Sequence, residues 1–276
     1  MSEEPEGSLV SEAAQAIAAI VEKVPIYQDA VQPAAREVGR GLQVVARAVN
    51  AALAPVEGLI WGVEKIRDFV REKISAKLEN VPAEDIQPPK PHVGVPTIDA
   101  LRYTGSEPAL SEMYANLLAI SMDKKTAHQA HPAFVDIIKN MSPDEARIMR
   151  FLASRPNNAI INVKLVKPDG GFNIVQRRLS LIGLDAGCEH AQLAQNYLDN
   201  LCRLGLVEIP EGRFIRSEDL YKRIEELPEI TNYLNQLRAI EGHKVKIEKR
   251  KLGITDLGNQ FIQACVVDKS VQARGG

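Results

Sequence analysis

The sequence predicts a mainly α-helical chain, with an N-terminal helical region followed by a winged-helix-like α+β region. Apolar residues recur every three or four positions in segments of the N-terminal region, as in amphipathic helices. Runs of β-branched residues around glycine turns appear later, after residue 156. The expected domains are an amphipathic helical region (1–80), a proline-rich linker (81–105), a helical core region (106–155) and a winged-helix-like domain with a helical insertion (156–276).

The composition is that of an ordinary globular protein and argues against several classes. The formal net charge of −2 provides no global positive field for nucleic acid. The cysteines Cys188, Cys202 and Cys265 are widely spaced and odd in number, which favours a reducing compartment over a disulfide framework or a clustered zinc site. The acidic N-terminus lacks the basic and apolar segments of a secretory signal, so we expect a cytoplasmic location.

The apolar segment at residues 48–66 has two interpretations. Only 16 residues lie between Arg47 and Glu64, and Asn50, Pro55 and Glu57 interrupt them, whereas a membrane-spanning helix needs about 20 mostly apolar residues. The three-to-four-residue period of the segment is typical of a helix packed in a core. The alternative is a surface that contacts a partner or a membrane. Gly58 and Gly62 would permit close backbone approach, and Trp61 would suit a lipid interface. Gly58, Trp61 and Gly62 are therefore the candidate partner- or membrane-contact residues.

The middle of the chain contains several residues that are typical of helix starts. Residues 80–98 contain five prolines and no sustained period, which predicts an extended linker before the helices resume. Ser106 is the expected N-cap of the next helix, and a shorter helix should begin after His131. Ser142 and Glu145 form the capping box that is expected to start a third helix.

The C-terminal region predicts a hairpin and then a helix. Residues 159–166 and 172–182 are rich in β-branched side chains and flank a proline–glycine turn, which indicates two paired strands. Residues 190–205 predict a helix that ends at Gly205.

The order of the remaining elements resembles a winged-helix domain. Residues 206–209 and 243–254 are expected to pair as strands, and Thr255 should cap a final helix. The departure from the winged-helix pattern is an extra helix at residues 217–240, between the two wing strands. A wing rebuilt in this way need not reach DNA.

Three segments carry a more specific pattern: LAPVEGLIWGVEKI, EPALSEMYANLLAISMDKKTAHQAHPAFVDIIKNMSPDEARI and LGITDLGNQFIQAC. Together they resemble the bacterial Abi-alpha family, which is named for a proposed role in abortive infection. The resemblance covers about residues 30–266, most of the chain. It implies a bacterial origin and a part in defence against phage, and it carries over no catalytic residue.

Polar groups in the middle region have a functional and a structural interpretation. Asp123, His128 and His131 lie close together in the sequence. Pro132 indicates a helix boundary beside them, which spoils the geometry of a metal site, so we expect a capping role or a buried hydrogen bond. Asn116 lies in an apolar helix and is expected to be an interhelical amide rather than a ligand-binding group.

Residues 243–251 are the best nucleic-acid candidate in the sequence, with Lys249, Arg250 and Lys251 as the candidate contacts. The alternation of charged and apolar residues there is equally typical of a half-buried strand. The helix that would recognise DNA carries Arg203 and little other basic charge. DNA binding is therefore the less expected interpretation.

The sequence shows no glycine-rich phosphate loop, nucleophile elbow or paired-cysteine site, and Cys188 beside His190 lacks a third orienting group. We therefore expect no enzyme and no cofactor. The predicted function is a phage-defence factor that acts through a protein partner, a second copy of the chain or conditional membrane association. The segment at 48–66 is expected to be packed at rest and exposed to a membrane or a partner when the defence is triggered. The alternative is a winged-helix DNA-binding regulator.

Overall fold

The computed structural model describes residues 63–269 of the chain. The candidate partner- or membrane-contact residues Gly58, Trp61 and Gly62 lie outside this range, so their role stays a prediction. Within the described range, no helix combines the length and the apolar character needed to cross a bilayer.

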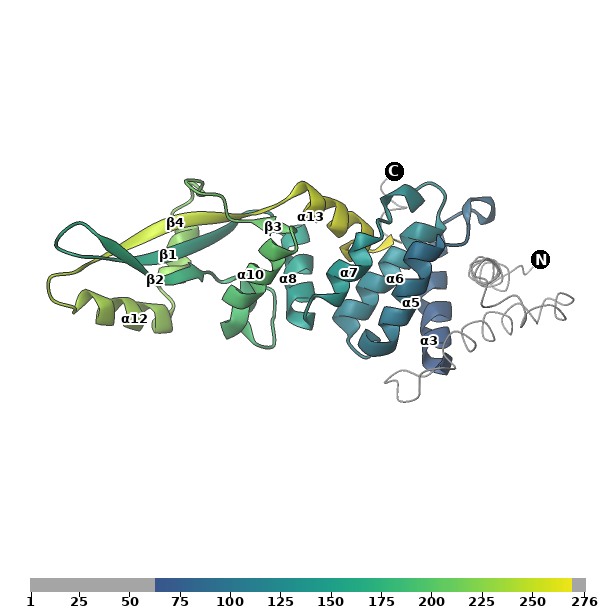
Figure 1. Ribbon diagram of the computed structural model, residues 1–276, viewed down its shortest axis with the longest axis horizontal. Coiled ribbons are helices and arrows are strands. Elements are labelled where there is room, and N and C mark those ends of the chain that lie inside the picture. The colour runs from purple at the N-terminus through teal and green to yellow at the C-terminus, as the bar shows by residue number, and fades with distance from the viewer. Residues whose placement is uncertain (1–62, 270–276) are drawn as a thin grey trace, which may run out of the picture. The chain divides into compact units, whose positions relative to one another are not determined.

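The chain divides into two compact units, which Figure 1 shows as a helical part and a sheet-containing part. The first unit comprises residues 1–143 and 261–276, so the C-terminal segment returns to the N-terminal half of the chain. The second unit comprises residues 144–260. Abundant helices and a small antiparallel sheet confirm the predicted fold class at this level. The winged-helix assignment and the predicted domain limits stay predictions.

The described part of the first unit is mainly helical. Its elements are α3 (Val63–Phe69), η2 (Val70–Ile74), α4 (Ser75–Leu78), η3 (Ala83–Asp85), α5 (Pro91–Thr104), α6 (Pro108–Met122), η4 (Ala127–Gln129), α7 (Ala133–Lys139) and η6 (Ile262–Val266). Helix α6 contacts α5, α7 and η6. Its side chains Tyr114, Leu117 and Ile120 are fully buried. A helix that is apolar on all sides is typical of a core, and α6 forms the centre of this unit.

The prediction of an extended linker is wrong for residues 91–104, which form α5. Pro91 occupies the first turn, where its missing N–H leaves no gap in the helical hydrogen bonds. Pro96 lies inside the helix, but Val93 and Leu101 are fully buried against the neighbouring helices. Burial of an apolar face thus outweighs the local preference of proline against helix.

The predicted helix starts agree with the structure to within a residue or two. Helix α6 begins at Pro108 with Glu107 as its N-cap, so Ser106 is not the cap. Proline at the first helical position has a backbone angle already suited to the helix, which explains the later start. Helix α8 (Pro143–Ser154) begins directly after Ser142, as predicted.

The second unit combines a curled antiparallel sheet with short helices. After α8 its elements are β1 (Asn158–Val166), β2 (Phe172–Leu179), α9 (Ile182–Asp185), η5 (Ala191–Leu193), α10 (Ala194–Arg203), β3 (Val207–Glu208), α11 (Asp219–Glu225), α12 (Pro228–Arg238), β4 (Lys244–Ile254) and α13 (Asp256–Phe261). The strand order is β2-β1-β4-β3. The predicted β1–β2 hairpin and the pairing of the two later strands are both confirmed.

Local signals also placed the helix ends in this unit. Gly205 has a φ of +75° at the end of α10, a backbone conformation that favours glycine. The Thr255 hydroxyl accepts a 2.9 Å hydrogen bond from the Gly258 N–H, which confirms the predicted cap of α13. The predicted single helix between the wing strands is two helices, because Pro228 begins a new helix after a break at Leu227.

The two faces of the sheet have different surroundings. Directly opposed residues of antiparallel strands share a face, so Ile161 of β1 shares one with its partner Lys249 of β4. Helices α11 and α12 cover this face, and the core beneath them comprises Ala159, Ile161, Tyr221 and Ile224 with Leu179, Leu181, Ile215, Leu220, Ile230 and Ile247. Even-numbered residues of β1 and β4 point to the opposite face.

Candidate functional site

The predicted nucleic-acid contacts Lys249, Arg250 and Lys251 do not form one surface. They are consecutive in β4, and successive side chains of a strand point to opposite faces. Lys249 lies on the helix-covered face, where it forms an ion pair with Glu218. Arg250 points the other way; its side chain is 13% exposed, and Nη2 donates a 2.9 Å hydrogen bond to the Ile209 carbonyl. Two of the three charges therefore have partners within the fold.

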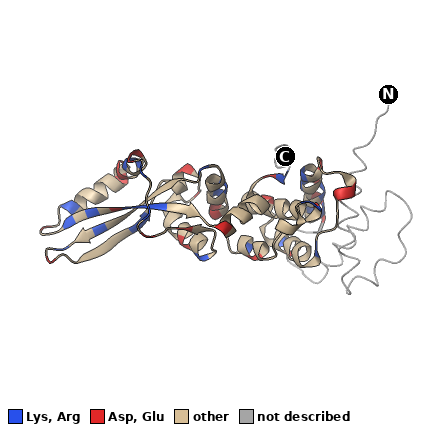
Figure 2. Cartoon of the chain, turned by 90° about the horizontal axis from the view of Figure 1, so that it is seen from above, with Lys and Arg blue, Asp and Glu red and all other residues tan. Residues whose placement is uncertain are grey.

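A different basic surface lies on the sheet face opposite α11 and α12, near the β1–β2 turn. We call it the open sheet face, and it consists of two rungs across β2, β1 and β4, namely Ile174–Lys164–Lys246 and Phe172–Val166–Lys244. Figure 2 shows lysine and arginine along these strands. The sequence alone does not indicate this surface. Its residues come from three strands, and only the register of β2, β1 and β4 brings them together.

The open sheet face combines apolar and positively charged side chains. The Phe172 ring is 53% exposed, and the Lys164 Nζ lies 4.5 Å from its centroid, a cation–π contact. Lys164 also forms a 2.7 Å ion pair with Glu248, and hydrogen bonding to Lys164 holds the pKa of Glu248 below its ordinary value. Lys244 and Lys246 are exposed and have no ion pair or side-chain hydrogen bond to any of residues 63–269. Both lysines therefore lie on β4 without such a partner, and β1 separates them from the exposed Phe172 on β2.

Strand β2 gives this surface a free edge. It is the first strand in the order β2-β1-β4-β3, so its outer backbone groups have no strand partner within the described residues. Helix α10 contacts β2 near Arg178, which pairs with Asp199, at the end of the strand away from Phe172. An exposed strand edge is a site where an extended peptide can add.

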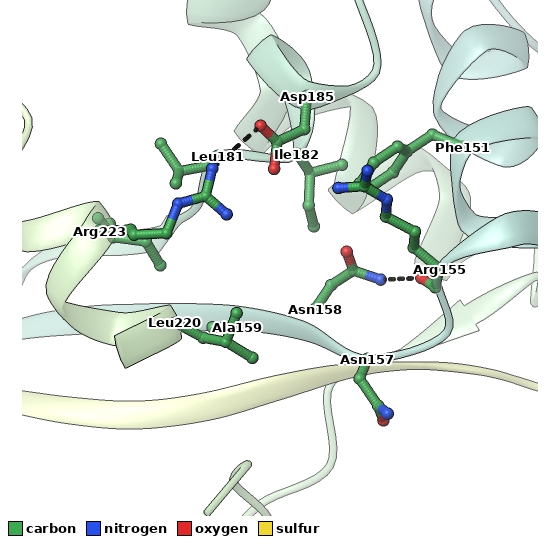
Figure 3. A pocket seen from close by; sticks show the side chains of 11 residues that line it. Phe151, Arg155, Asn157, Asn158, Ala159, Leu181, Ile182, Asp185, Leu220 and Arg223 are labelled. Carbon is green, nitrogen blue, oxygen red and sulfur yellow. Dashed lines mark hydrogen bonds and ion pairs between the residues drawn. The ribbon is translucent and has the colours of Figure 1, made fainter. Parts of the chain in front are cut away.

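A hollow of about 110 Å³ lies elsewhere in the second unit. It forms where the end of α8, the start of β1, α9 and α11 meet (Figure 3). Arg155, Asn158 and Arg223 line it together with apolar side chains. No sequence pattern indicates this hollow, because four separate segments build it.

A comparison with protein-family models finds a match to abortive infection alpha over residues 62–265, which is most of the chain. The chain belongs to the abortive infection alpha family. The resemblance seen in the sequence is thereby confirmed. The family's name suggests a part in abortive-infection defence, and the mechanism is a separate question.

Among solved structures, this abortive infection alpha protein is similar to an uncharacterized protein from the hydrocarbon-degrading marine bacterium Alcanivorax borkumensis SK2. The two share 21% sequence identity, the match covers 50% of this chain and 92% of that chain, and the TM-score is 0.34. This degree of similarity assigns no function. No curated protein matches the chain.

A buried carboxylate, Asp144, organises the second unit of this family member and was missed by the sequence analysis. It accepts hydrogen bonds from the Glu189 N–H at 2.8 Å and from the His190 N–H and the Tyr197 hydroxyl at 3.0 Å. Burial on its own raises the pKa of Asp144, but these hydrogen bonds and the one from Arg147 lower it to about 2. Asp144 therefore holds the segment after α9 against the start of α8 as an ionised group.

Cys188 lies beside this carboxylate. Its thiol donates a hydrogen bond to the Asp144 carbonyl at 3.6 Å. Burial, followed by the negative charge of Asp144, raises the pKa of Cys188 to about 11, so the thiol stays protonated at neutral pH. A protonated thiol is a poor nucleophile.

Polar groups singled out in the first unit have structural partners. The Asn116 side-chain amide donates a 3.0 Å hydrogen bond to the Cys265 carbonyl, so Asn116 links α6 to η6 as an interhelical amide, as predicted. Asp123 forms a 2.6 Å ion pair with Lys269. The His131 Nδ1 accepts a 3.1 Å hydrogen bond from the Ala133 N–H at the start of α7, although the N-cap residue itself is Pro132.

Proposed function

We propose that the protein defends bacteria against phage by abortive infection, and that it acts by binding an acidic protein partner rather than by catalysis. Membership of the abortive infection alpha family supports the defence role. The open sheet face supports the binding role. The observation that carries the proposal is the pair of exposed lysines, Lys244 and Lys246, which share the sheet face opposite α11 and α12 with the exposed Phe172 two strands away.

The chemistry of this face suits a protein segment that carries carboxylates. An apolar side chain of the partner can pack against Phe172, because exposed aromatic groups are common anchors in interfaces. Carboxylates can pair with Lys244 and Lys246, which steers association and selects an acidic sequence. Backbone groups at the edge of β2 can add hydrogen bonds to an extended segment. A lipid surface would make no use of a strand edge.

The defence role is tested with bacterial cultures that do or do not express the protein. With few phages per cell, we expect the expressing culture to survive while the other lyses. With several phages per cell, we expect the expressing culture to stop growing without releasing phage, because abortive infection sacrifices infected cells. An expressing culture that keeps growing at a high phage ratio would contradict the abortive mechanism, and no protection at either ratio would contradict the defence role.

Conditional membrane association is the other route to binding, through the apolar segment at 48–66. Trp61 is the only tryptophan in the sequence, so its fluorescence reports on this segment without a label. We expect no blue shift on addition of anionic vesicles and no flotation with them. A blue shift together with flotation would replace the acidic protein partner by a lipid surface.

A winged-helix DNA-binding role is the second candidate, and one feature favours it. The connection from β3 to α11 lies where a winged helix has its wing. It exposes Arg213 and Arg216, and Phe214 between them is 59% exposed. We expect duplex DNA binding to be weak, non-specific and lost as salt rises. A sequence-selective complex that survives physiological salt and is abolished by Arg213→Glu with Arg216→Glu would reverse this ranking.

A further inference from the structure

Two guanidinium groups converge on the hollow in the second unit. Arg155 follows the end of α8 and Arg223 lies on α11, and Figure 3 shows both side chains directed toward the centre of the hollow. The Asn158 side chain rises between them from the start of β1. Three polar groups from three elements thus face one small space.

The Arg155 guanidinium is positioned without using its hydrogen-bond donors. Its central carbon lies 5.6 Å from the centroid of the Phe151 ring, within the range of a cation–π contact. A cation–π contact does not use the N–H donors of the guanidinium. No side-chain hydrogen bond or ion pair to Arg155 occurs within the described part of the chain. Arg155 is therefore an exposed cation at the rim of the hollow, and its donors are open to a ligand.

The positive charge of Arg223 is only partly balanced by a long ion pair. Its nearest acidic partner is Asp185, with 3.5 Å between Nη2 and Oδ1, and the Arg223 side chain is 54% exposed. Charge-assisted hydrogen bonds between such groups are usually about 2.7–2.9 Å long, so donors of Arg223 stay available. Two guanidinium groups and one carboxylate leave the hollow with an excess of positive charge.

Asn158 adds an acceptor to these donors. Its Nδ2 donates a 2.6 Å hydrogen bond to the Arg155 carbonyl, and Figure 3 shows the side-chain oxygen directed into the hollow. Asn158 is itself buried. Within the described residues no group donates to this oxygen, and it faces the hollow, so a ligand there can donate to it. A ligand that matches this site has an anionic part for the arginines and an O–H for Asn158.

We propose that this hollow binds the phosphate group of a small phosphate-bearing molecule. Phosphate oxygens can accept hydrogen bonds from both guanidinium groups, and a singly ionised phosphate keeps an O–H to donate to Asn158. An ionised carboxylate has no such donor. At about 110 Å³ the hollow is smaller than the roughly 300–1,000 Å³ of sites that enclose a whole drug-sized ligand, so the phosphate enters and the remainder of the ligand lies outside. This site is independent of the partner proposed for the open sheet face.

The site is tested by titrating the full chain with inorganic phosphate, glycerol phosphate and acetate at constant ionic strength. Binding is followed by NMR of the arginine side-chain N–H groups in ¹⁵N-labelled protein. We expect saturable shifts with the two phosphates and weaker ones with acetate. Tighter binding of glycerol phosphate would identify an organic phosphate as the ligand, and equal binding would identify phosphate itself. The absence of saturation, or acetate binding as tight as phosphate, overturns the proposal.

Two kinds of substitution should change the phosphate affinity in opposite directions, which a purely structural role of these residues would not produce. Arg155→Gln and Arg223→Gln should each weaken phosphate binding about tenfold, the loss expected for one charged hydrogen bond. Asp185→Asn should instead strengthen binding by up to about fivefold, because it releases Arg223 from a surface ion pair. Unfolding midpoints equal to that of the parent chain establish that each variant folds. If folded Asp185→Asn binds phosphate more weakly than the parent, the two arginines do not form this site.

Discussion

Two sets of lysines, one in each unit of this protein, have opposite surroundings. In the first unit, Lys269 is buried and forms an ion pair of 2.6 Å with the equally buried Asp123. In the second unit, Lys244 and Lys246 are exposed on the open sheet face and lack an ion-pair partner within residues 63–269. The same residue type thus serves the fold in one unit and is available to a partner in the other.

The buried charges of the first unit tie the C-terminal segment to helices far away in the sequence. Lys77 pairs with Asp268 at 2.7 Å, and Asn116 donates a hydrogen bond to the Cys265 carbonyl. Such interactions contribute little net stability relative to apolar packing, but losing one partner is costly. They fix where the last described residues lie. A charge left unpaired on the surface costs little, so Lys244 and Lys246 are not needed for folding.

The largest expected effect separates the two kinds of lysine. Lys269→Met leaves the Asp123 carboxylate buried without its cation and should lower the free energy of unfolding by about 3–5 kcal/mol. Lys246→Met on the open sheet face should change it by less than about 0.5 kcal/mol. Urea unfolding of both variants measures the difference. Equal losses in the two variants would contradict the division of roles.

The next effect concerns acid stability of the second unit. The pKa of Asp144 is about 2 in the folded protein and near 3.8 when unfolded, so its contribution is complete above about pH 4 and is lost as the pH falls toward 2. The shift corresponds to roughly 2 kcal/mol. We expect Asp144→Asn to lower the free energy of unfolding at neutral pH. The difference in this free energy between the variant and the parent chain should become smaller as the pH falls from 4 to 2. A gap that does not change with pH would show that the ionised carboxylate is not the stabilising form.

The smallest expected effect is at the junction of the two units, where α8 begins. Ser142→Ala should lower the free energy of unfolding by about 1 kcal/mol, the usual cost of losing an N-cap. Ser217→Ala, at an exposed position of a loop, is the matched control and should have no measurable effect. Identical urea midpoints for both variants would mean that the start of α8 does not depend on the Ser142 hydroxyl.

Local signals predicted those parts of the fold that local chemistry determines. Gly205 ends α10, Thr255 caps α13 and His131 binds a backbone N–H at the start of α7, because each acts on backbone groups a few residues away. The helix at residues 91–104 was missed because its prolines argue against helix, whereas the stabilising burial depends on distant segments. Sequence reasoning fails here where tertiary packing decides.

The candidate sites were harder to predict than the elements that carry them. Asp144 lies more than forty residues before Glu189 and His190, to which it binds, so no spacing connects them. The hollow draws its arginines from separate helical segments. Lys249 and Arg250 are neighbours in the sequence, but they point to opposite faces of the sheet. The run of basic residues therefore predicted one shared surface that the strand does not form.

The most direct test of the central claim measures whether a variant with reversed charges on the open sheet face still protects cells against phage. Lys244→Glu with Lys246→Glu should abolish protection in a plating assay while the unfolding midpoint stays within experimental error of the parent. The matched control, Lys65→Glu with Lys222→Glu, makes the same change in net charge at exposed lysines elsewhere and should protect as the parent does. Full protection by the first variant, or an equal loss in both, would contradict the claim that the open sheet face is where this protein binds its partner.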